Sequence, residues 1–89
     1  MLNAEGGKAR QLVIDSDDAQ EYKKLYTTKR HAIRILPKQM TFASDVIICK
    51  DKLYMTAYDQ SMVSGTEIFS GPLIETWQQL FEWMWETVA

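Results

Sequence analysis

Hydrophobic and polar positions follow two different periods along this 89-residue chain. Apolar residues at every second position, or short β-branched runs between turn residues, indicate strands. Five segments meet this description: 11–15, 31–37, 45–50, 52–59 and 62–70. Two longer segments show helical spacing, one over 16–29 and one of about 18 residues that begins at Ser70 or Gly71. The predicted order is strand, helix, four strands and a terminal helix.

The clearest alternation lies in 52–59. Leu53, Met55 and Ala57 occupy one predicted face, and Tyr54, Thr56 and Tyr58 occupy the other. Lys50 and Asp51 favour a turn that joins this strand to 45–50 as a hairpin, and a second turn is predicted over 59–61. Gly65, in the middle of the last strand, indicates a bulge or a close backbone approach.

The terminal helix carries much aromatic surface, because all three tryptophans lie between residues 77 and 85. At about 100° per residue, one arc of this helix contains Leu73, Ile74, Trp77, Leu80, Phe81, Met84, Trp85 and Val88. We expect this arc to face the core. Trp83 lies outside it, on the flank beside Thr76 and Thr87, and has no predicted core role.

These elements predict an α/β fold, with α+β as the alternative, built on a mixed sheet of about five strands and two helices. The polar segment 1–10, which contains Gly6 and Gly7, is expected to be a flexible lead-in or linker, and 11–89 a single domain. Two helices cannot cover both faces of such a sheet well, so one face is expected to be open to a partner.

Composition and charge narrow the function classes. The net charge is −2; residues 1–38 hold eight basic and five acidic residues, a charge of +3, and residues 39–89 hold two basic and seven acidic, a charge of −5. A complete nucleic-acid-binding protein usually has a stronger basic patch. Cys49 is the single cysteine, and no segment reaches the roughly 18 apolar residues of a membrane span. We expect a cytoplasmic protein that does not bind a membrane.

Candidate catalytic and metal-binding residues are few. His31 is the only histidine, so no second one is available to build a metal site. The segment 15–18 has three carboxylates but lacks the glycine and the later glutamate of a calcium loop, and an acidic helix start explains it better. We predict no catalytic residue, no metal site and no cofactor.

The interface candidates are Trp83, Tyr54 and Tyr58, because aromatic residues are enriched at interface cores. We expect a homodimer formed by the open sheet face or by the terminal helix. The alternative for Trp83 is contact with the loop 38–44 of its own chain. Stacking of nucleic-acid bases on the two tyrosines would need more basic neighbours than Lys50 and Lys52.

Three segments together resemble the phospholipase D-like effector domain of TrmB-family transcriptional regulators: IRILP (33–37), DVIICKDKLYMTAYD (45–59) and GTEIFSGPLIETWQQLFEWMWE (65–86). The most specific feature is the helix that ends in Phe81 and Trp85. The resemblance covers about 11–89 and implies an α/β fold like half of a phospholipase D domain. In these regulators the domain follows a DNA-binding winged helix and helps to dimerise or to sense.

The chain departs from the family pattern in three respects. It carries no winged helix, so DNA would be bound only through a domain absent from this chain. His31 is not followed by the lysine of the His-x-Lys-x4-Asp signature of active phospholipase D enzymes. The β-rich region that binds sugar in some members is also missing, so the resemblance does not extend to sugar binding. A small-molecule effector of unknown identity is one expected partner.

We therefore expect a non-catalytic regulatory, effector and dimerisation domain of a TrmB-like regulator. Two alternatives remain. One is a degenerate phospholipase D-like hydrolase or nuclease half-domain, completed by a dimer. The other is a stand-alone protein-interaction module.

Overall fold

The computed structural model describes residues 1–42, 44–59 and 62–88, without the side chains of residues 58, 59, 62 and 63. Its elements in chain order are β1 (Leu2–Glu5), β2 (Lys8–Val13), α1 (Ala19–Tyr26), β3 (His31–Ile35), β4 (Ser44–Ile48), β5 (Leu53–Asp59), β6 (Met62–Ile68) and α2 (Gly71–Thr87).

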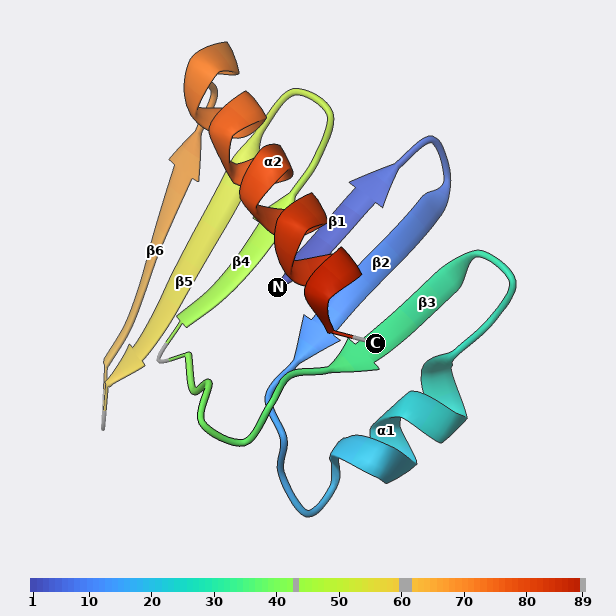
Figure 1. The fold of residues 1–89 in the computed structure, drawn as a ribbon. Coiled ribbons are helices and arrows are strands. Elements are labelled where there is room, and N and C mark those ends of the chain that lie inside the picture. The colour runs from blue at the N-terminus through green and yellow to red at the C-terminus, as the bar shows by residue number, and fades with distance from the viewer. Residues whose placement is uncertain (43, 60–61, 89) are drawn as a thin grey trace.

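The strands form one mixed sheet in the order β3-β2-β1-β4-β5-β6 (Figure 1). β2 and β3 are parallel and are connected through α1, and β1 and β4 are also parallel. The other neighbours are antiparallel, so β4, β5 and β6 form a meander. This arrangement confirms the mixed α/β class with two helices, and the sheet has six strands where about five were predicted.

The additional strand comes from the segment 1–10, and the expectation of a flexible lead-in is wrong. β1 lies in the middle of the sheet, and Met1 and Asn3 are buried. Gly6 and Gly7 have φ values of 57° and 79°, so they form the two-residue turn between β1 and β2. Positive φ at both positions is what the tightest hairpin turns require. The glycines that suggested flexibility therefore create a hairpin.

The predicted turn at Lys50 and Asp51 is confirmed, since it connects β4 to β5 and the Cys49 N–H donates to the Lys52 carbonyl oxygen at 2.8 Å. The predicted turn over 59–61 includes residues 60 and 61, which lie outside the described residues.

The bulge predicted at Gly65 is absent. The pairing of β5 with β6 runs without interruption from Leu53 opposite Ile68 to Asp59 opposite Met62. A Cβ atom added at Gly65 would meet its neighbours at 3.8 Å or more, which is ordinary contact. The glycine is therefore not required by the backbone of this strand.

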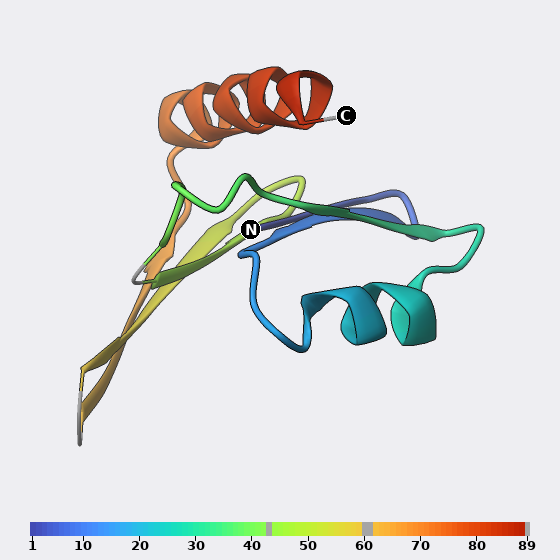
Figure 2. The same ribbon diagram turned by 60° about the horizontal axis from the view of Figure 1, so that its bottom comes forward.

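The two helices lie on opposite faces of the sheet (Figure 2). α1 contacts β3 on one face, and α2 crosses the other face as an outer layer. The core between α2 and the sheet consists of Met1, Leu12, Leu36, Val46, Ile48, Leu53, Ile74 and Phe81. Since side chains alternate along a strand, Tyr54 of β5 points to the face opposite α2.

The apolar arc of α2 is wider than the sheet can cover. Ile74 and Phe81 are buried, whereas Leu73 and Leu80 are 48% and 46% exposed. The expectation that the whole arc faces the core is therefore wrong for these two leucines. The helix is rotated so that its buried line passes through Ile74 and Phe81, and one edge of its apolar arc faces solvent.

Substitutions at two positions on different sides of α2 test this orientation. Phe81→Ala is expected to lower the free energy of unfolding by about 3–5 kcal/mol, because a fully buried ring leaves a cavity in a close-packed core. Gln79→Ala, on the exposed side, should change it by less than about 0.5 kcal/mol. Urea denaturation followed by circular dichroism measures both values, and equal losses would contradict the orientation.

Candidate interaction surface on the terminal helix

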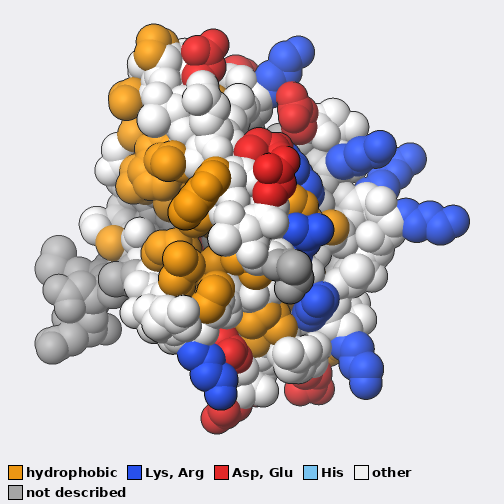
Figure 3. All heavy atoms as spheres, in the orientation of Figure 1, with side chains coloured by type: hydrophobic (Ala, Val, Ile, Leu, Met, Phe, Trp, Pro, Cys, Tyr) orange, Lys and Arg blue, Asp and Glu red, His pale blue; other side chains and the backbone are white. Residues whose placement is uncertain are grey.

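One flank of the part of α2 that the sheet leaves uncovered is apolar. Seven residues lie within about 120° of arc, and we name them the α2 stripe: Leu73, Thr76, Trp77, Leu80, Trp83, Met84 and Thr87. Trp83 is the most exposed large apolar side chain of the helix, at 62%. No member of the stripe is charged. Figure 3 shows hydrophobic side chains gathered along α2, with acidic side chains on its other flank.

The threonines do not make the stripe polar. The Thr76 hydroxyl donates to the Pro72 carbonyl oxygen at 2.9 Å, and the Thr87 hydroxyl donates to the Trp83 carbonyl oxygen at 2.7 Å. Both hydroxyl protons are thus satisfied within the helix. A partner could cover these residues without leaving a buried donor unpaired, which would otherwise cost about 1–3 kcal/mol.

A groove of about 250 Å³ lies beside the stripe. Its lining residues are Met1, Phe42, Ser44, Val46, Met55, Trp77, Leu80, Trp83 and Met84. Phe42, from the connection between β3 and β4, is 43% exposed at its edge. The lining is almost entirely apolar and includes no charged side chain, so the groove suits an apolar side chain better than a polar ligand or a reaction.

Arg10 of β2 holds the flank of α2 that lies opposite the stripe. Its guanidinium donates two hydrogen bonds to the Glu82 carboxylate. It also lies 5.3 Å from the ring centroid of Phe81 and 5.7 Å from that of Trp85. The hydrogen bond with Arg10 lowers the pKa of Glu82 and, in turn, raises the pKa of Arg10.

Arg34 of β3 holds the C-terminal end of the same helix. Its guanidinium lies 4.3 Å from the ring centroid of Trp85 and donates hydrogen bonds to the carbonyl oxygens of Trp85 and Val88. The last turn of α2 has no basic residue of its own. Arg34 therefore satisfies carbonyl groups that a helix end leaves unpaired and complements the negative end of the helix dipole.

The structure does not bring the predicted interface residues together. Tyr54 is half-buried on the sheet face opposite α2, where the Lys52 ammonium lies 5.5 Å from its ring centroid. Tyr58 is part of β5, but its side chain lies outside the described residues. Trp83 and Tyr54 cannot belong to one continuous surface, because the sheet separates them.

His31 takes part in a hydrogen-bond network between α1 and the sheet. The Gln11 side-chain oxygen accepts a hydrogen bond from the Tyr22 hydroxyl at 3.0 Å and lies 3.0 Å from His31 Nε2. This oxygen can only accept, so the network assigns the proton of His31 to Nε2. Within residues 1–42, 44–59 and 62–88, no cluster of three or more His, Cys, Asp or Glu side chains could hold a metal ion.

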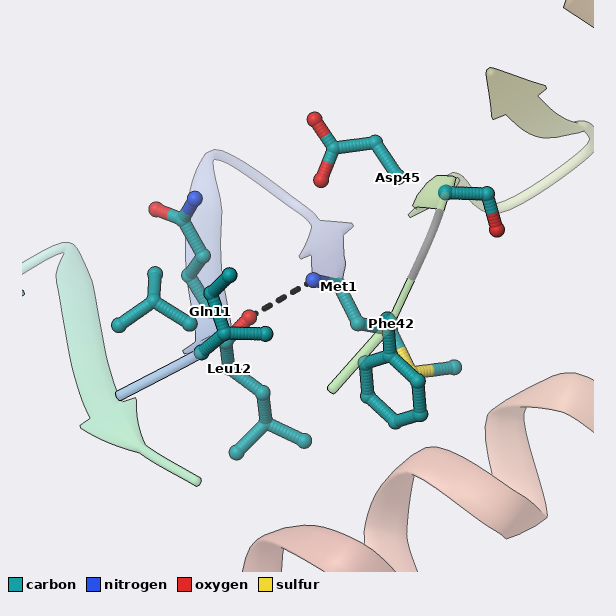
Figure 4. Close-up of a pocket in the computed structure, with 8 residues that line it drawn as sticks. Met1, Gln11, Leu12, Phe42 and Asp45 are labelled. Carbon is teal, nitrogen blue, oxygen red and sulfur yellow. Dashed lines mark hydrogen bonds between the residues drawn. The ribbon is translucent and has the colours of Figure 1, made fainter. Parts of the chain in front are cut away.

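A second hollow of about 250 Å³ opens between the end of β2 and the start of β4 (Figure 4). The Met1 amino group lies there and donates to the Leu12 carbonyl oxygen at 2.7 Å. Burial lowers the pKa of this amino group, and the nearby Asp45 carboxylate opposes the shift. Phe42 lines both this hollow and the groove beside α2, so the two depressions adjoin.

Comparisons of the chain with protein-family models, with curated proteins and with solved structures found no match. None of the helices in the described ranges combines the length and hydrophobicity that a membrane crossing requires.

Sequence reasoning identified Trp83 but missed Leu73, Leu80 and Phe42 as surface residues. One signal could have revealed the leucines. The positions 73, 77, 80, 84 and 87 are spaced alternately by four and three residues. This spacing is typical of a helix that packs against another helix, whereas a helix on a sheet needs only the Ile74 and Phe81 side.

The Arg10–Glu82 pair predicts a small acid-dependent loss of stability. The pKa of Glu82 is lower in the folded chain than its ordinary value of 4.5, so the pair stabilises the fold above that value and the contribution is lost as the pH falls through the folded pKa. Because the pair is partly exposed, its contribution should be about 0.2–1 kcal/mol.

Glu82→Gln should therefore destabilise the chain at neutral pH, and the difference from the original chain should shrink at about pH 3, well below the ordinary carboxyl pKa. Urea denaturation at both pH values measures it. Glu75→Gln is the control on the same helix. A difference for Glu82→Gln that stays constant with pH would contradict the prediction.

Proposed function

We propose that this chain is a non-catalytic interaction domain that forms a homodimer through the α2 stripe. One observation carries this function: an uncharged helix face, whose threonine hydroxyls are hydrogen-bonded within the helix and whose Trp83 is 62% exposed, adjoins an apolar groove. Monomeric proteins rarely expose large contiguous apolar patches, and such patches usually mark interaction sites. The domain would mediate association within a larger assembly rather than catalyse a reaction.

The resemblance of segments 33–37, 45–59 and 65–86 to TrmB-family effector domains suggests where such a dimer would act. We propose a regulatory role in the cytoplasm, in which dimerisation brings together two winged-helix domains that are absent from this chain. A small-molecule effector would act by changing the association. Among the described residues, His31 contacts the side chain of Gln11. This contact does not favour the hydrolase alternative.

The oligomeric state tests the proposed function. Light scattering should give a dimer mass at about 100 μM, a generous concentration on the affinity scale. Leu80→Lys should shift the equilibrium to monomer, because a charge would be buried without a partner. Gln79→Lys is the matched control, since it places the same charge on the adjacent residue outside the stripe.

Two results would oppose this function. One is a monomer at that concentration for the unaltered chain. The other is an equal loss of dimer in Leu80→Lys and Gln79→Lys, which would show that added charge, rather than the stripe, controls association. Circular dichroism of each variant must match the original chain, so that unfolding is not mistaken for dissociation.

The DNA-binding properties provide a second test. The isolated chain has a net charge of −2 and should bind DNA weakly, because affinity depends mainly on neutralised phosphates. Fluorescence anisotropy with a DNA duplex at about 0.15 M salt measures it. Salt-sensitive binding tighter than about 1 μM, beyond the usual non-specific range, would mean that the basic residues of 1–38 form a nucleic-acid surface.

A further inference from the structure

The α2 stripe is symmetric about Leu80. Leu73 and Thr87 lie seven residues from it on either side, Thr76 and Met84 lie four, and Trp77 and Trp83 lie three. All of these positions occupy the same arc of the helix. The spacing of the stripe residues is therefore the same in both directions from Leu80.

Such a pattern matters because of how identical surfaces meet. In a two-fold symmetric contact each patch faces its own copy. When two identical helices cross in opposite directions, the residue on the axis meets itself, and a residue before the axis meets the one equally far after it. A helix with a symmetric apolar stripe therefore matches apolar positions with apolar positions along its whole length in the antiparallel arrangement, when the centre of the stripe lies on the axis.

We propose that the partner of the α2 stripe is a second copy of this chain, packed with the two α2 helices antiparallel and Leu80 on the two-fold axis. This inference rests on the proposed function and adds the arrangement of the two copies. Trp83 of each protomer lies against Trp77 of the partner subunit, and Leu73 lies against the methyl group of the partner's Thr87.

The pairing matches the exposure of each residue. Trp83 is 62% exposed and projects from the helix, whereas Trp77 is half-buried and lines the groove. A projecting ring on one protomer therefore meets a recessed ring on the other, twice in each dimer. Aromatic pairs of this kind contribute more to the free energy of association than the burial of their surface area alone.

The area available suits a dimer of standard size. Phe42, Leu73, Leu80 and Trp83 are each between 43% and 62% exposed. Their exposed parts sum to roughly 400 Å², taking about 200 Å² for a large apolar side chain. One side of a standard interface buries about 800 Å², of which somewhat more than half, or about 450 Å², is apolar.

Charge also favours a second copy. A strongly acidic or basic partner would find no opposite charge within the stripe. A second α2 brings only uncharged side chains to the contact, and helical spacing places Glu75, Glu82 and Glu86 outside the stripe, on the other flank of each helix. The dimer therefore forms without like charges facing each other, although each chain is negative overall.

The sheet leaves room for a second helix. α2 is the outermost layer on its face, and β5 and β6 extend beyond it (Figures 1 and 2). The residues of these strands on the α2 side include Met55, Ala57, Ser64 and Thr66, which are paired across the two strands and uncharged. The uncovered strands leave the flank of α2 that carries the stripe accessible to a second helix.

Crosslinking between single-cysteine chains tests the arrangement. Cys49→Ser removes the native thiol, and Leu73→Cys and Thr87→Cys are prepared separately in that background. A mixture of the two variants, treated with a short bismaleimide, should give covalent dimers in which one chain carries each cysteine. Leu73→Cys alone should give few covalent dimers, because the antiparallel arrangement places its two copies at opposite ends of the contact. One of the two variants is isotope-labelled, so that the mass of each covalent dimer shows which two chains it contains.

The outcomes separate the arrangement from the function. Preferential Leu73–Thr87 crosslinks support the antiparallel dimer. Preferential Leu73–Leu73 crosslinks mean a parallel pair, and dimers by light scattering with neither crosslink mean a different surface; both overturn the inference. A chain that light scattering shows to be monomeric overturns the proposed function as well. Glu75→Cys, on the other flank, is the control for random collision and should not crosslink.

Discussion

The rest of this structure depends on how α2 is held against the sheet. Ile74 and Phe81 of the helix are buried in the core. Arg10 of β2 binds the flank of the helix that lies opposite the stripe, and Arg34 of β3 binds its C-terminal end. Each arginine combines charge with contact to an aromatic ring. These contacts fix the rotation of the helix about its own axis, and that rotation decides which residues remain exposed.

The exposed stripe is a consequence of this rotation. A helix on a sheet buries only the side that faces the strands, and the apolar arc of α2 is wider than that side. Arg10 draws Glu82 and the rings of Phe81 and Trp85 towards the sheet, so the opposite edge, with Leu73 and Leu80, turns to solvent. A small domain has little apolar surface to spare, so leaving these side chains uncovered is a cost that association would offset.

The two faces of the sheet differ in how well they suit a binding partner. On the α1 face, Gln11 connects Tyr22 of the helix with His31 of β3, so polar side chains there are used in internal contacts. On the α2 face, the groove and the stripe present mainly apolar side chains, and the hydroxyl groups of Thr76 and Thr87 are hydrogen-bonded within the helix. A partner that gains its affinity from desolvation would therefore bind the α2 face.

The sequence by itself determined the local elements, because hydrophobic period and turn chemistry act over a few residues. The alternation in 52–59, the turn at Lys50 and Asp51, and the amphipathic terminal helix all appear in the structure near their predicted positions. Trp83 could also be recognised as lying outside the buried arc, since its angular position depends only on helical periodicity. β1 was missed because a glycine pair reads equally as a flexible segment and as a hairpin turn until a neighbouring strand is in place. Only the tertiary structure decided that Leu73 and Leu80 are exposed and that Trp83 and Tyr54 lie on opposite faces. Those outcomes depend on contacts of Arg10 and Arg34 with residues more than 50 positions away, and no periodicity within a single element contains that information.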